Sequence, residues 1–281
     1  MQTLRIMSNN LWYCDANRPA WAAQGLDCSA EVRARGFAAV YARLQPDVLG
    51  LQECSPLLLD ELTQHFARIG LPYAVLWGHD TPLLYRRDRF ELVDSDYLLY
   101  PEAFPGHEGS FNNGRTKSAA AAVLRRKTDG AMLIVATTHL WWKSSHPDSP
   151  FYQPHSGEAR AYQLGLLMDR LERMMAQYGC PAVMMGDFNA GYDSLTVQSA
   201  MQRGWQHAHD MAAEYADEGN GHHPCGDQGY EPYAPRPFRF SLDQIMCRNA
   251  PEGFVRRFDR YAEASYMALS DHLPVWIDAA L

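Results

Sequence analysis

The chain has 281 residues, 47% of them hydrophobic, and a formal net charge of −8. A chain of this length can bury a large core. Its acidic balance argues against a protein that grips a long nucleic-acid duplex, because duplex binding usually needs a basic face. A small or single-stranded phosphate compound suits the charge balance better.

The sequence shows no sign of export or membrane insertion. Met1 leads directly into the first predicted strand, without the basic and apolar segments of a signal peptide. No apolar stretch reaches the ~20 residues that a helix needs to cross a bilayer. The six cysteines have no paired CxxC spacing, and without an export signal we expect them to be reduced thiols. We therefore expect a cytoplasmic protein with no membrane span and no obligate protein partner.

The predicted elements begin with an apolar strand over residues 4–12 that ends in amides. A helix follows over residues 29–44, with Ser29 as its N-cap. The next strand is a short β run over residues 47–52, which stops at Glu53. The first two strands of the chain therefore both end in polar side chains.

A second helix and a series of strands make up the middle of the chain. Ser55-Pro56 begins the helix, because proline is tolerated at the first helical position, and Gly70 ends it. Alternating or continuous apolar runs then predict strands over residues 73–77, 82–86, 89–100 and 117–126.

Asp129-Gly130 predicts a hairpin turn before the longest β-branched run, residues 132–139, which ends at His139. A long helix over residues 156–178 then leads into a strand over residues 182–187. Strands at the beginning, middle and end of the chain cannot pair as one simple meander. We therefore expect two sheets packed face to face with helices outside.

Four irregular stretches separate these elements, and we expect them to determine substrate choice. The segment His222-His223-Pro224-Cys225 suggests zinc, but no second ligand pair stands at zinc-finger spacing. A loosely packed lid is our interpretation of that stretch. The four stretches cover residues 12–28, 101–116, 141–154 and 217–239.

Polar side chains gather where the apolar runs stop. Asp187 and Asn189 are one residue apart, so in an extended segment both leave on the same face. A carboxylate and an amide so placed can hold a water molecule or a hard metal ion. Asp271-His272 adds a carboxylate and an imidazole at what we interpret as another strand end. Each motif alone is also compatible with a plain strand-to-turn junction, but several in one chain favour a shared site.

Taken together, the motifs show that the sequence resembles the endonuclease/exonuclease/phosphatase superfamily. Six motifs occur in the same order as in that superfamily, and they span nearly the whole chain. The resemblance implies a single domain over residues 1–281 with an α/β fold: a four-layer α/β/β/α sandwich of two packed mixed sheets with outer helices, as in DNase I. The superfamily comprises metal-dependent nucleases, deadenylases, sphingomyelinases, inositol-phosphate phosphatases and tyrosyl-DNA phosphodiesterases. The motifs are Ser8-Asn9-Asn10-Leu11, Leu51-Gln52-Glu53, Thr137-Thr138-His139-Leu140, Gly186-Asp187-Phe188-Asn189, Ser241-Leu242-Asp243-Gln244-Ile245 and Ser270-Asp271-His272.

The resemblance also implies roles for the residues in these motifs. Glu53 is the expected ligand of Mg²⁺ or Mn²⁺, and Asn10 and Asp271 complete or support the metal site. Asp187 aligns or deprotonates the attacking water, and Asn189 orients it or holds a phosphate oxygen.

The two histidines are expected to act on the phosphate. His272 contacts the scissile group, and Asp243 sets its tautomer and favours its charged form. Whether His272 is a base or a cationic stabiliser stays open at this point. His139 binds another phosphate oxygen. Its presence argues against the abasic-site endonuclease branch, which usually has tyrosine there.

Three further residues are candidates for substrate binding. Trp142 follows a predicted catalytic strand end and can stack on a base or another planar group, which contributes ~1–3 kcal/mol per base. Lys143 stands where phosphate-directed basic residues occur in some deadenylase-like relatives, and Arg115 has a similar status. Packing of the loops, or simple solvation, is the alternative for each of the three.

We predict a Mg²⁺-dependent phosphoesterase that acts on a nucleotide or single-stranded nucleic acid. A sphingomyelinase-like enzyme, an inositol-phosphate-type phosphoesterase and a non-catalytic binding protein on the same scaffold are the alternatives. An inactive descendant is expected to have lost a catalytic side chain. None of the expected ones is missing: Glu53, Asp187, Asp243 and His272.

Overall fold

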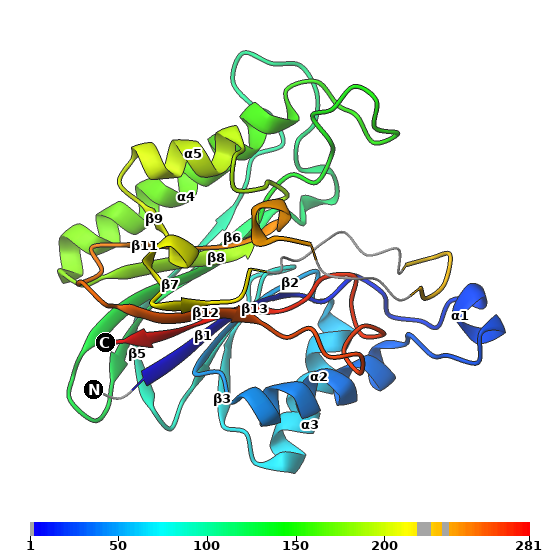
Figure 1. Cartoon of the computed structure of the whole chain (residues 1–281), viewed down its shortest axis with the longest axis horizontal. Coiled ribbons are helices and arrows are strands. Elements are labelled where there is room, and N and C mark those ends of the chain that lie inside the picture. The colour runs from blue at the N-terminus through cyan, green and yellow to red at the C-terminus, as the bar shows by residue number, and fades with distance from the viewer. Residues whose placement is uncertain (1–2, 218–225, 232–235) are drawn as a thin grey trace.

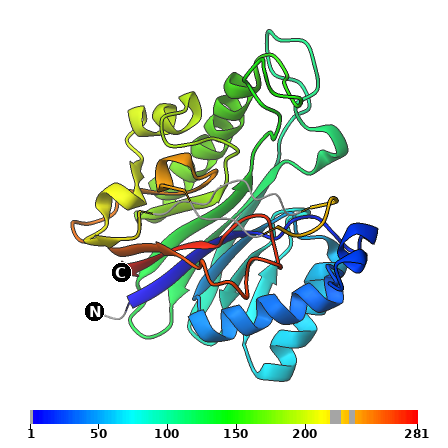
Figure 2. The same cartoon turned by 45° about the vertical axis from the view of Figure 1, so that its right-hand side comes forward.

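The computed structural model describes residues 3–217, 226–231 and 236–281, and it contains two mixed β-sheets packed face to face between layers of helices (Figures 1 and 2). The first sheet runs in the order β10 (Glu214–Tyr215), β12 (Val255–Arg260), β13 (Val275–Ala280), β1 (Thr3–Asn10), β2 (Val48–Gln52), β4 (Leu83–Arg86) and β3 (Tyr73–Leu76). The second sheet runs in the order β5 (Phe90–Leu99), β6 (Ser118–Arg126), β7 (Met132–His139), β8 (Ala182–Asp187), β11 (Asp243–Arg248) and β9 (Gln206–His207).

Helices cover the outer face of each sheet, so the predicted four-layer α/β/β/α arrangement is confirmed. In Figure 1, α2 (Ala30–Leu44) and α3 (Pro56–Ile69) lie below the first sheet, whereas α4 (Ser156–Tyr178) and α5 (Leu195–Gln202) lie above the second. The shorter helical segments are α1 (Pro19–Ala23), α6 (Ala208–Met211) and two 3₁₀ turns at Asn113–Arg115 and Phe238–Phe240.

The central strands are apolar on both faces because each face is covered. In β8, Val183 and Met185 pack between the two sheets, while Ala182 and Met184 pack under the helices of the second sheet. The same alternation divides the residues of β6 between the two cores. Such strands appear in the sequence as continuous apolar runs, which is why their positions were predictable.

The register of the parallel strand pairs brings the polar strand ends together. In the first sheet, β1 and β2 run parallel and Asn10 lies opposite Gln52, directly before Glu53. In the second sheet, β7 and β8 run parallel and His139 lies opposite Asp187. Because all four strands end at the same edge of the sandwich, their last side chains meet there.

Local sequence signals set the helix ends. The hydroxyl oxygen of Ser55 accepts the backbone N–H of Leu58 at 3.0 Å and caps α3, whose last turn ends at Gly70 in the left-handed conformation. Ser29 occupies the predicted N-cap position of α2, although its side chain makes no capping hydrogen bond. Both helices lie within one residue of their predicted bounds.

Three expectations need correction or fall outside the structure. The stretch predicted as irregular over residues 12–28 contains the short helix α1. Asp271-His272 does not end a strand: it precedes β13, because the apolar run that follows the motif forms that strand. The possible zinc motif at residues 222–225 lies outside the described residues. Among those described, no helix combines the length and apolarity needed to span a membrane.

Candidate active site

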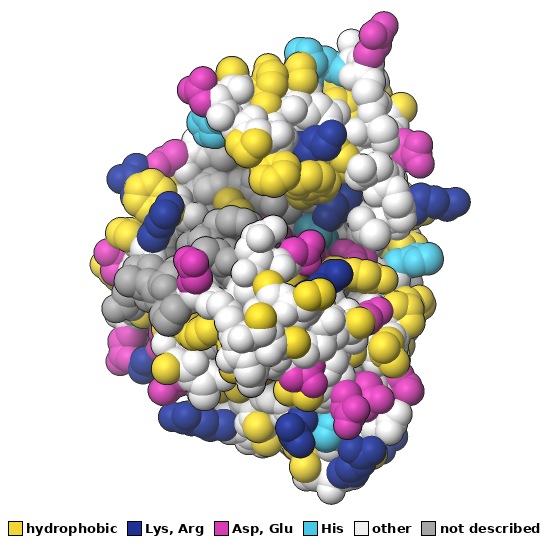
Figure 3. Space-filling view, turned by 90° about the vertical axis from the view of Figure 1, so that its right-hand side faces the viewer, with side chains coloured by type: hydrophobic (Ala, Val, Ile, Leu, Met, Phe, Trp, Pro, Cys, Tyr) yellow, Lys and Arg dark blue, Asp and Glu magenta, His cyan; other side chains and the backbone are white. Residues whose placement is uncertain are grey.

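A cavity of about 500 Å³ opens at the edge of the sandwich where β1, β2, β7 and β8 end. Figure 3 views the molecule from this end and shows hydrophobic side chains around a hollow in which acidic, basic and histidine side chains lie close together. The cavity is lined by Tyr13, Glu53, Asp80, Thr116, Lys117, His139, Trp142, Ser144, Ser149, Phe151, Asp187, Asn189, Leu242, Asp271 and His272.

Asn10 joins the carboxylates of the two sheets. It is fully buried, and its amide nitrogen donates to Asp187 Oδ2 at 2.9 Å and to Glu53 Oε1 at 3.3 Å. Its amide oxygen accepts the backbone N–H of Trp12 at 2.9 Å. In this arrangement Asn10 positions two carboxylates that could hold a metal ion, while direct coordination by its oxygen stays a prediction.

Glu53 stands where positive charge stabilises its carboxylate. Its Oε2 accepts the backbone N–H of Tyr13 at 2.8 Å. Burial alone would raise the pKa of Glu53, but the electrostatic interactions with His139 and Lys117 outweigh burial and lower it. The carboxylate is therefore ionised at neutral pH, as a cation ligand must be.

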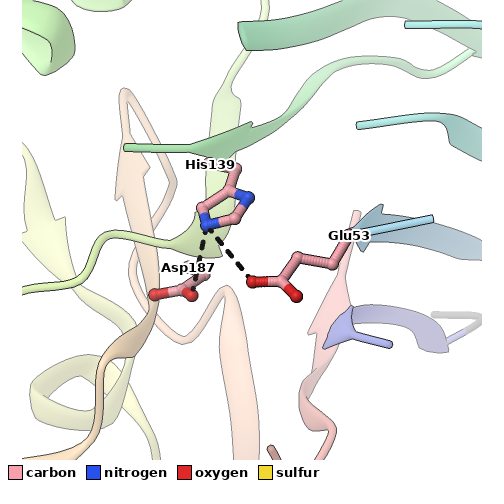
Figure 4. Close-up of side chains that lie close together, drawn as sticks. All are labelled: Glu53, His139 and Asp187. Atoms are coloured by element: carbon pink, nitrogen blue, oxygen red, sulfur yellow. Dashed lines mark ion pairs between the residues drawn. The ribbon is translucent and has the colours of Figure 1, made fainter. Parts of the chain in front are cut away.

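Figure 4 shows that His139 points at both carboxylates: its Nε2 lies 3.6 Å from Asp187 Oδ2 and 3.8 Å from Glu53 Oε1. Its Nδ1 lies 2.9 Å from Asp80 Oδ2, and its Nε2 lies 2.7 Å from Lys117 Nζ. Asp80 accepts the proton on Nδ1 and so orients the imidazole, whose Nε2 faces Lys117 and the two carboxylates.

Sequence reasoning missed Asp80 and Lys117, which are both buried. The predicted site residues mostly follow apolar runs, whereas Lys117 lies at the beginning of one. Because β6 runs antiparallel to β7 and Ser118 pairs with His139, the beginning of β6 lies at the catalytic edge. Burial lowers the pKa of Lys117, although Asp80 and Glu53 act to raise it. The antiparallel direction of β6 is the sequence signal that could have located Lys117. Asp80 lies in the loop before β4, and no sequence signal indicates its position.

On the other side of the cavity, His272 and Asp243 form a close pair. His272 Nδ1 lies 2.7 Å from Asp243 Oδ2, and His272 Nε2 lies 3.9 Å from Asp187 Oδ2. Asp243 begins β11 directly opposite Asp187. Burial would lower the pKa of His272, but the carboxylates of Asp243 and Asp187 outweigh it and raise the pKa well above its usual value. The imidazole is therefore positively charged at neutral pH.

The donor set fits a hard divalent cation. Asp271 lines the same cavity, and its buried Oδ1 has no hydrogen-bond partner among the described residues. Burial raises the pKa of Asp271 to about 7 although the charge of His272 acts to lower it, so burial of this carboxylate is only partly compensated. Together with Glu53 and Asp187 it offers carboxylate oxygens without any thiolate, the ligand type that Mg²⁺ and Mn²⁺ prefer.

Asn189 lines the cavity as predicted, but its backbone conformation differs from the predicted extended one. The strand ends at Asp187, and Asn189 adopts a left-handed backbone conformation with φ 49°, so the two residues do not belong to one extended segment. The backbone N–H of Asn189 donates to Asp187 Oδ1 at 2.8 Å, and its side chain donates to Leu140 O at 3.2 Å. A tight turn therefore brings the two side chains to the same site.

The three predicted substrate-binding residues lie in different places relative to the cavity. Trp142 is 40% exposed and lines the cavity, as does Tyr13, whereas the neighbouring Trp141 is fully buried. Lys143 borders an adjoining cavity instead. Arg115 is exposed and is not among the described residues that line the catalytic cavity. Its role in substrate binding stays a prediction.

Comparisons with known proteins agree with this geometry. The model of the Endonuclease/Exonuclease/phosphatase family matches residues 10–272. A mannosyl-6-phosphatase from Bacteroides thetaiotaomicron VPI-5482 is similar in structure, with a TM-score of 0.76 and 18% identity over 99% of this chain and 100% of the other. The human Nocturnin catalytic domain has a TM-score of 0.62 and 20% identity over 99% and 94% of the two chains.

A third solved structure is TDP2 from D. rerio complexed with single strand DNA product, with a TM-score of 0.63 and 18% identity over the whole of both chains. Identities this low show a shared fold and nothing finer. Comparison of the sequence with curated proteins gives no match.

The charge on His272 yields a test of the pair. In Asp243→Asn the largest positive contribution to the pKa of His272 is lost, so that pKa should fall. An NMR titration of the imidazole resonances in the metal-free protein measures the change. Asp129→Asn, at the turn between β6 and β7, is the matched control and should leave the titration of His272 where it was. An unchanged His272 titration in Asp243→Asn would contradict the proposed electrostatics.

Proposed function

The chain belongs to the endonuclease/exonuclease/phosphatase family, whose members hydrolyse phosphate esters, and on this premise we propose a phosphoesterase that uses Mg²⁺ or Mn²⁺. One observation carries the proposal. Carboxylates from both sheets converge with two histidines and a buried lysine in a single cavity. The set offers negative oxygens for a cation and positive groups for a phosphate.

Asp187 is placed to align the attacking water and accept its proton. Its Oδ1 is held by the backbone N–H of Asn189 and its Oδ2 by the amide of Asn10, so the carboxylate has a fixed orientation. His272, charged and 3.9 Å from Asp187 Oδ2, faces the same space. We propose that His272 stabilises negative charge on the phosphoryl oxygens rather than acting as the base, because it is already protonated at neutral pH.

Positive charge on the opposite wall supports the same role. Lys117 and His139 form a contact pair that Asp80 orients, and both border the cavity. They are placed to bind a further phosphoryl oxygen. A divalent cation bound at Glu53 and Asp271 would neutralise phosphate charge and lower the pKa of a bound water.

For the substrate we propose a nucleotide or short single strand of nucleic acid. Tyr13, Trp142 and Phe151 are exposed aromatic side chains that line the cavity, and the rings of Trp142 and Phe151 lie 5.6 Å apart. Such rings can stack on a base beside a bound phosphate. The similarity to a protein solved with single strand DNA product is compatible with this choice.

A phosphorylated sugar is the second candidate. Three hydroxyl side chains line the cavity beside the aromatic rings, and a sugar presents both an apolar ring face and hydroxyl groups to such a wall. The structural similarity to a mannosyl-6-phosphatase favours this candidate as well. The hydroxyl residues are Thr116, Ser144 and Ser149.

We propose the cytoplasm as the compartment. The described cysteines are all free thiols in the structure, as expected in a reducing environment.

The first prediction concerns the cation. Hydrolysis should stop after exhaustive EDTA treatment and return with Mg²⁺ or Mn²⁺, because the cavity presents carboxylates that need a compensating charge. Glu53→Gln should raise the Mg²⁺ concentration needed for half-maximal activity. Activity that survives EDTA, or normal metal dependence in Glu53→Gln, would overturn the metal assignment.

The second prediction concerns the groups that act in the transition state. Asp187→Asn and His272→Ala should each lower kcat by ~10²-fold or more. Lys117→Gln should also lower kcat, because the positive charge of Lys117 would face the bound phosphate. Lys127→Gln, a matched change at the end of the β6–β7 hairpin, should not. Near-normal turnover in Asp187→Asn or His272→Ala, with circular dichroism unchanged, would refute the mechanism.

The third prediction concerns substrate class and uses a side-by-side panel of phosphate esters with Mg²⁺. Nucleotides or short single strands should be cleaved faster than duplex DNA or choline phospholipids. Trp142→Ala should raise KM more than it lowers kcat, because stacking contributes equally to the ground state and the transition state. Fastest cleavage of sugar phosphates would select the second candidate. A preference for sphingomyelin or abasic duplex would exclude both.

A further inference from the structure

A second cavity of about 300 Å³ adjoins the catalytic one. Trp142, Ser144, Asn189 and Leu242 line both cavities, so the two cavities adjoin along these residues. The remaining walls of the second cavity are Lys143, Ser145, His146, Arg160, Ala190, Gly191 and Ser194.

The two cavities differ in charge. The catalytic cavity contains four carboxylates, which a divalent cation would partly neutralise. The described residues that line the second cavity include Lys143 and Arg160 but no Asp or Glu. In a chain with a net charge of −8, a concave surface with two cations and no acid is unexpected unless it binds an anion.

Arg160 is the strongest sign of an anion site. It lies in α4 and is only 6% exposed, and no carboxylate among the described residues forms an ion pair with it. The carboxylates of Asp187 and Glu158 act on Arg160 only from beyond ion-pair distance. Its Nη1 donates to Trp141 O at 3.2 Å and to Lys143 O at 2.7 Å, while its buried Nε has no hydrogen-bond partner. A buried guanidinium normally has an anionic partner.

Arg160 also remains charged despite its burial. Burial lowers the pKa of Arg160 to about 10, so the side chain is protonated at neutral pH. The two carbonyl groups that it binds belong to the segment that carries Trp142 and Lys143. Arg160 therefore fixes the wall between the two cavities and contributes positive charge behind it.

Lys143 provides the second charge. Its Nζ lies 5.9 Å from the ring centroid of Trp141 and 6.0 Å from that of Trp142, and no described carboxylate pairs with it. The lysine is half-buried on the rim of the second cavity. Its ammonium group can therefore turn toward an anion in that cavity without first breaking an ion pair.

We propose that the second cavity is a phosphate subsite, which holds another phosphate group of the molecule whose scissile phosphate lies in the catalytic cavity. The inference rests on the proposed phosphoesterase function and narrows its substrate to compounds with two phosphate groups. Two cations and several hydroxyl groups match the charge and the many acceptor oxygens of phosphate. Asn189, which lines both cavities, lies between the two phosphate positions.

The test compares matched substrates on the Mg²⁺-loaded enzyme: adenosine 5′-monophosphate against adenosine 3′,5′-bisphosphate, and fructose 6-phosphate against fructose 1,6-bisphosphate. The wild type should favour the bisphosphate in at least one pair by about tenfold in kcat/KM, mostly through KM. Lys143→Gln should reduce that ratio toward one. Lys127→Gln removes the same charge from the far hairpin and should preserve the ratio. A ratio near one for both pairs in the wild type, or an unchanged ratio in Lys143→Gln, would overturn the subsite.

Binding measurements test the phosphate subsite independently of the proposed phosphoesterase activity. Calorimetry on Asp187→Asn measures the affinity for each monophosphate and bisphosphate without turnover. Tighter bisphosphate binding that depends on Lys143 supports the subsite even if no panel ester is hydrolysed, in which case only the proposed function fails. Hydrolysis without any bisphosphate preference in kinetics or binding defeats the subsite and leaves the proposed function intact.

Discussion

The close approach of the two sheets at Gly50 is the constraint on which the catalytic edge depends. A Cβ atom at this position would lie 2.7 Å from Met185 Cε and 2.7 Å from Thr137 Cβ, so only glycine lets β2 pack this closely against β7 and β8. Gly50 lies three residues before Glu53, and its two contacts lie two residues before Asp187 and His139. Contact between the sheets at Gly50 therefore determines the separation of the candidate catalytic groups Glu53, His139 and Asp187, which come from different sheets.

Two residues that follow the strands, Glu53 and Asn189, have strained backbone conformations that help to place side chains in the cavity. Glu53 and Asn189 both adopt left-handed conformations, with φ of 53° and 49°, one and two residues after the parallel strands β2 and β8. This conformation costs roughly 1–2 kcal/mol for a residue other than glycine, and Glu53 lacks the local hydrogen bonding that eases it for asparagine. Each turn redirects the chain so that the side chain faces the cavity. Strain so placed indicates that cavity geometry, rather than local stability, determines these positions.

The sequence predicted the buried strands and the helix ends well because both depend on local signals, namely continuous apolar runs and capping residues such as Ser55 and Gly70. It also identified the cavity residues that terminate strands. It could not place Asp80, because the loop that carries it meets His139 through a contact between residues 59 positions apart. The Asp271-His272 motif was assigned to the wrong end of a strand, since an apolar run and a polar cluster do not reveal strand direction.

Charge distribution explains why net charge was only a partial guide to the substrate. The four carboxylates of the catalytic cavity contribute to the acidic total, and their charge would repel an anionic substrate unless a bound cation offset it. Positive charge is concentrated nearby, at Lys117 and His272 inside the cavity and at Lys143 and Arg160 in its neighbour. A compact substrate can place its phosphates in these two cavities. A long duplex extends its phosphates over the rest of an acidic surface, so the local and global charges both favour the compact ligand.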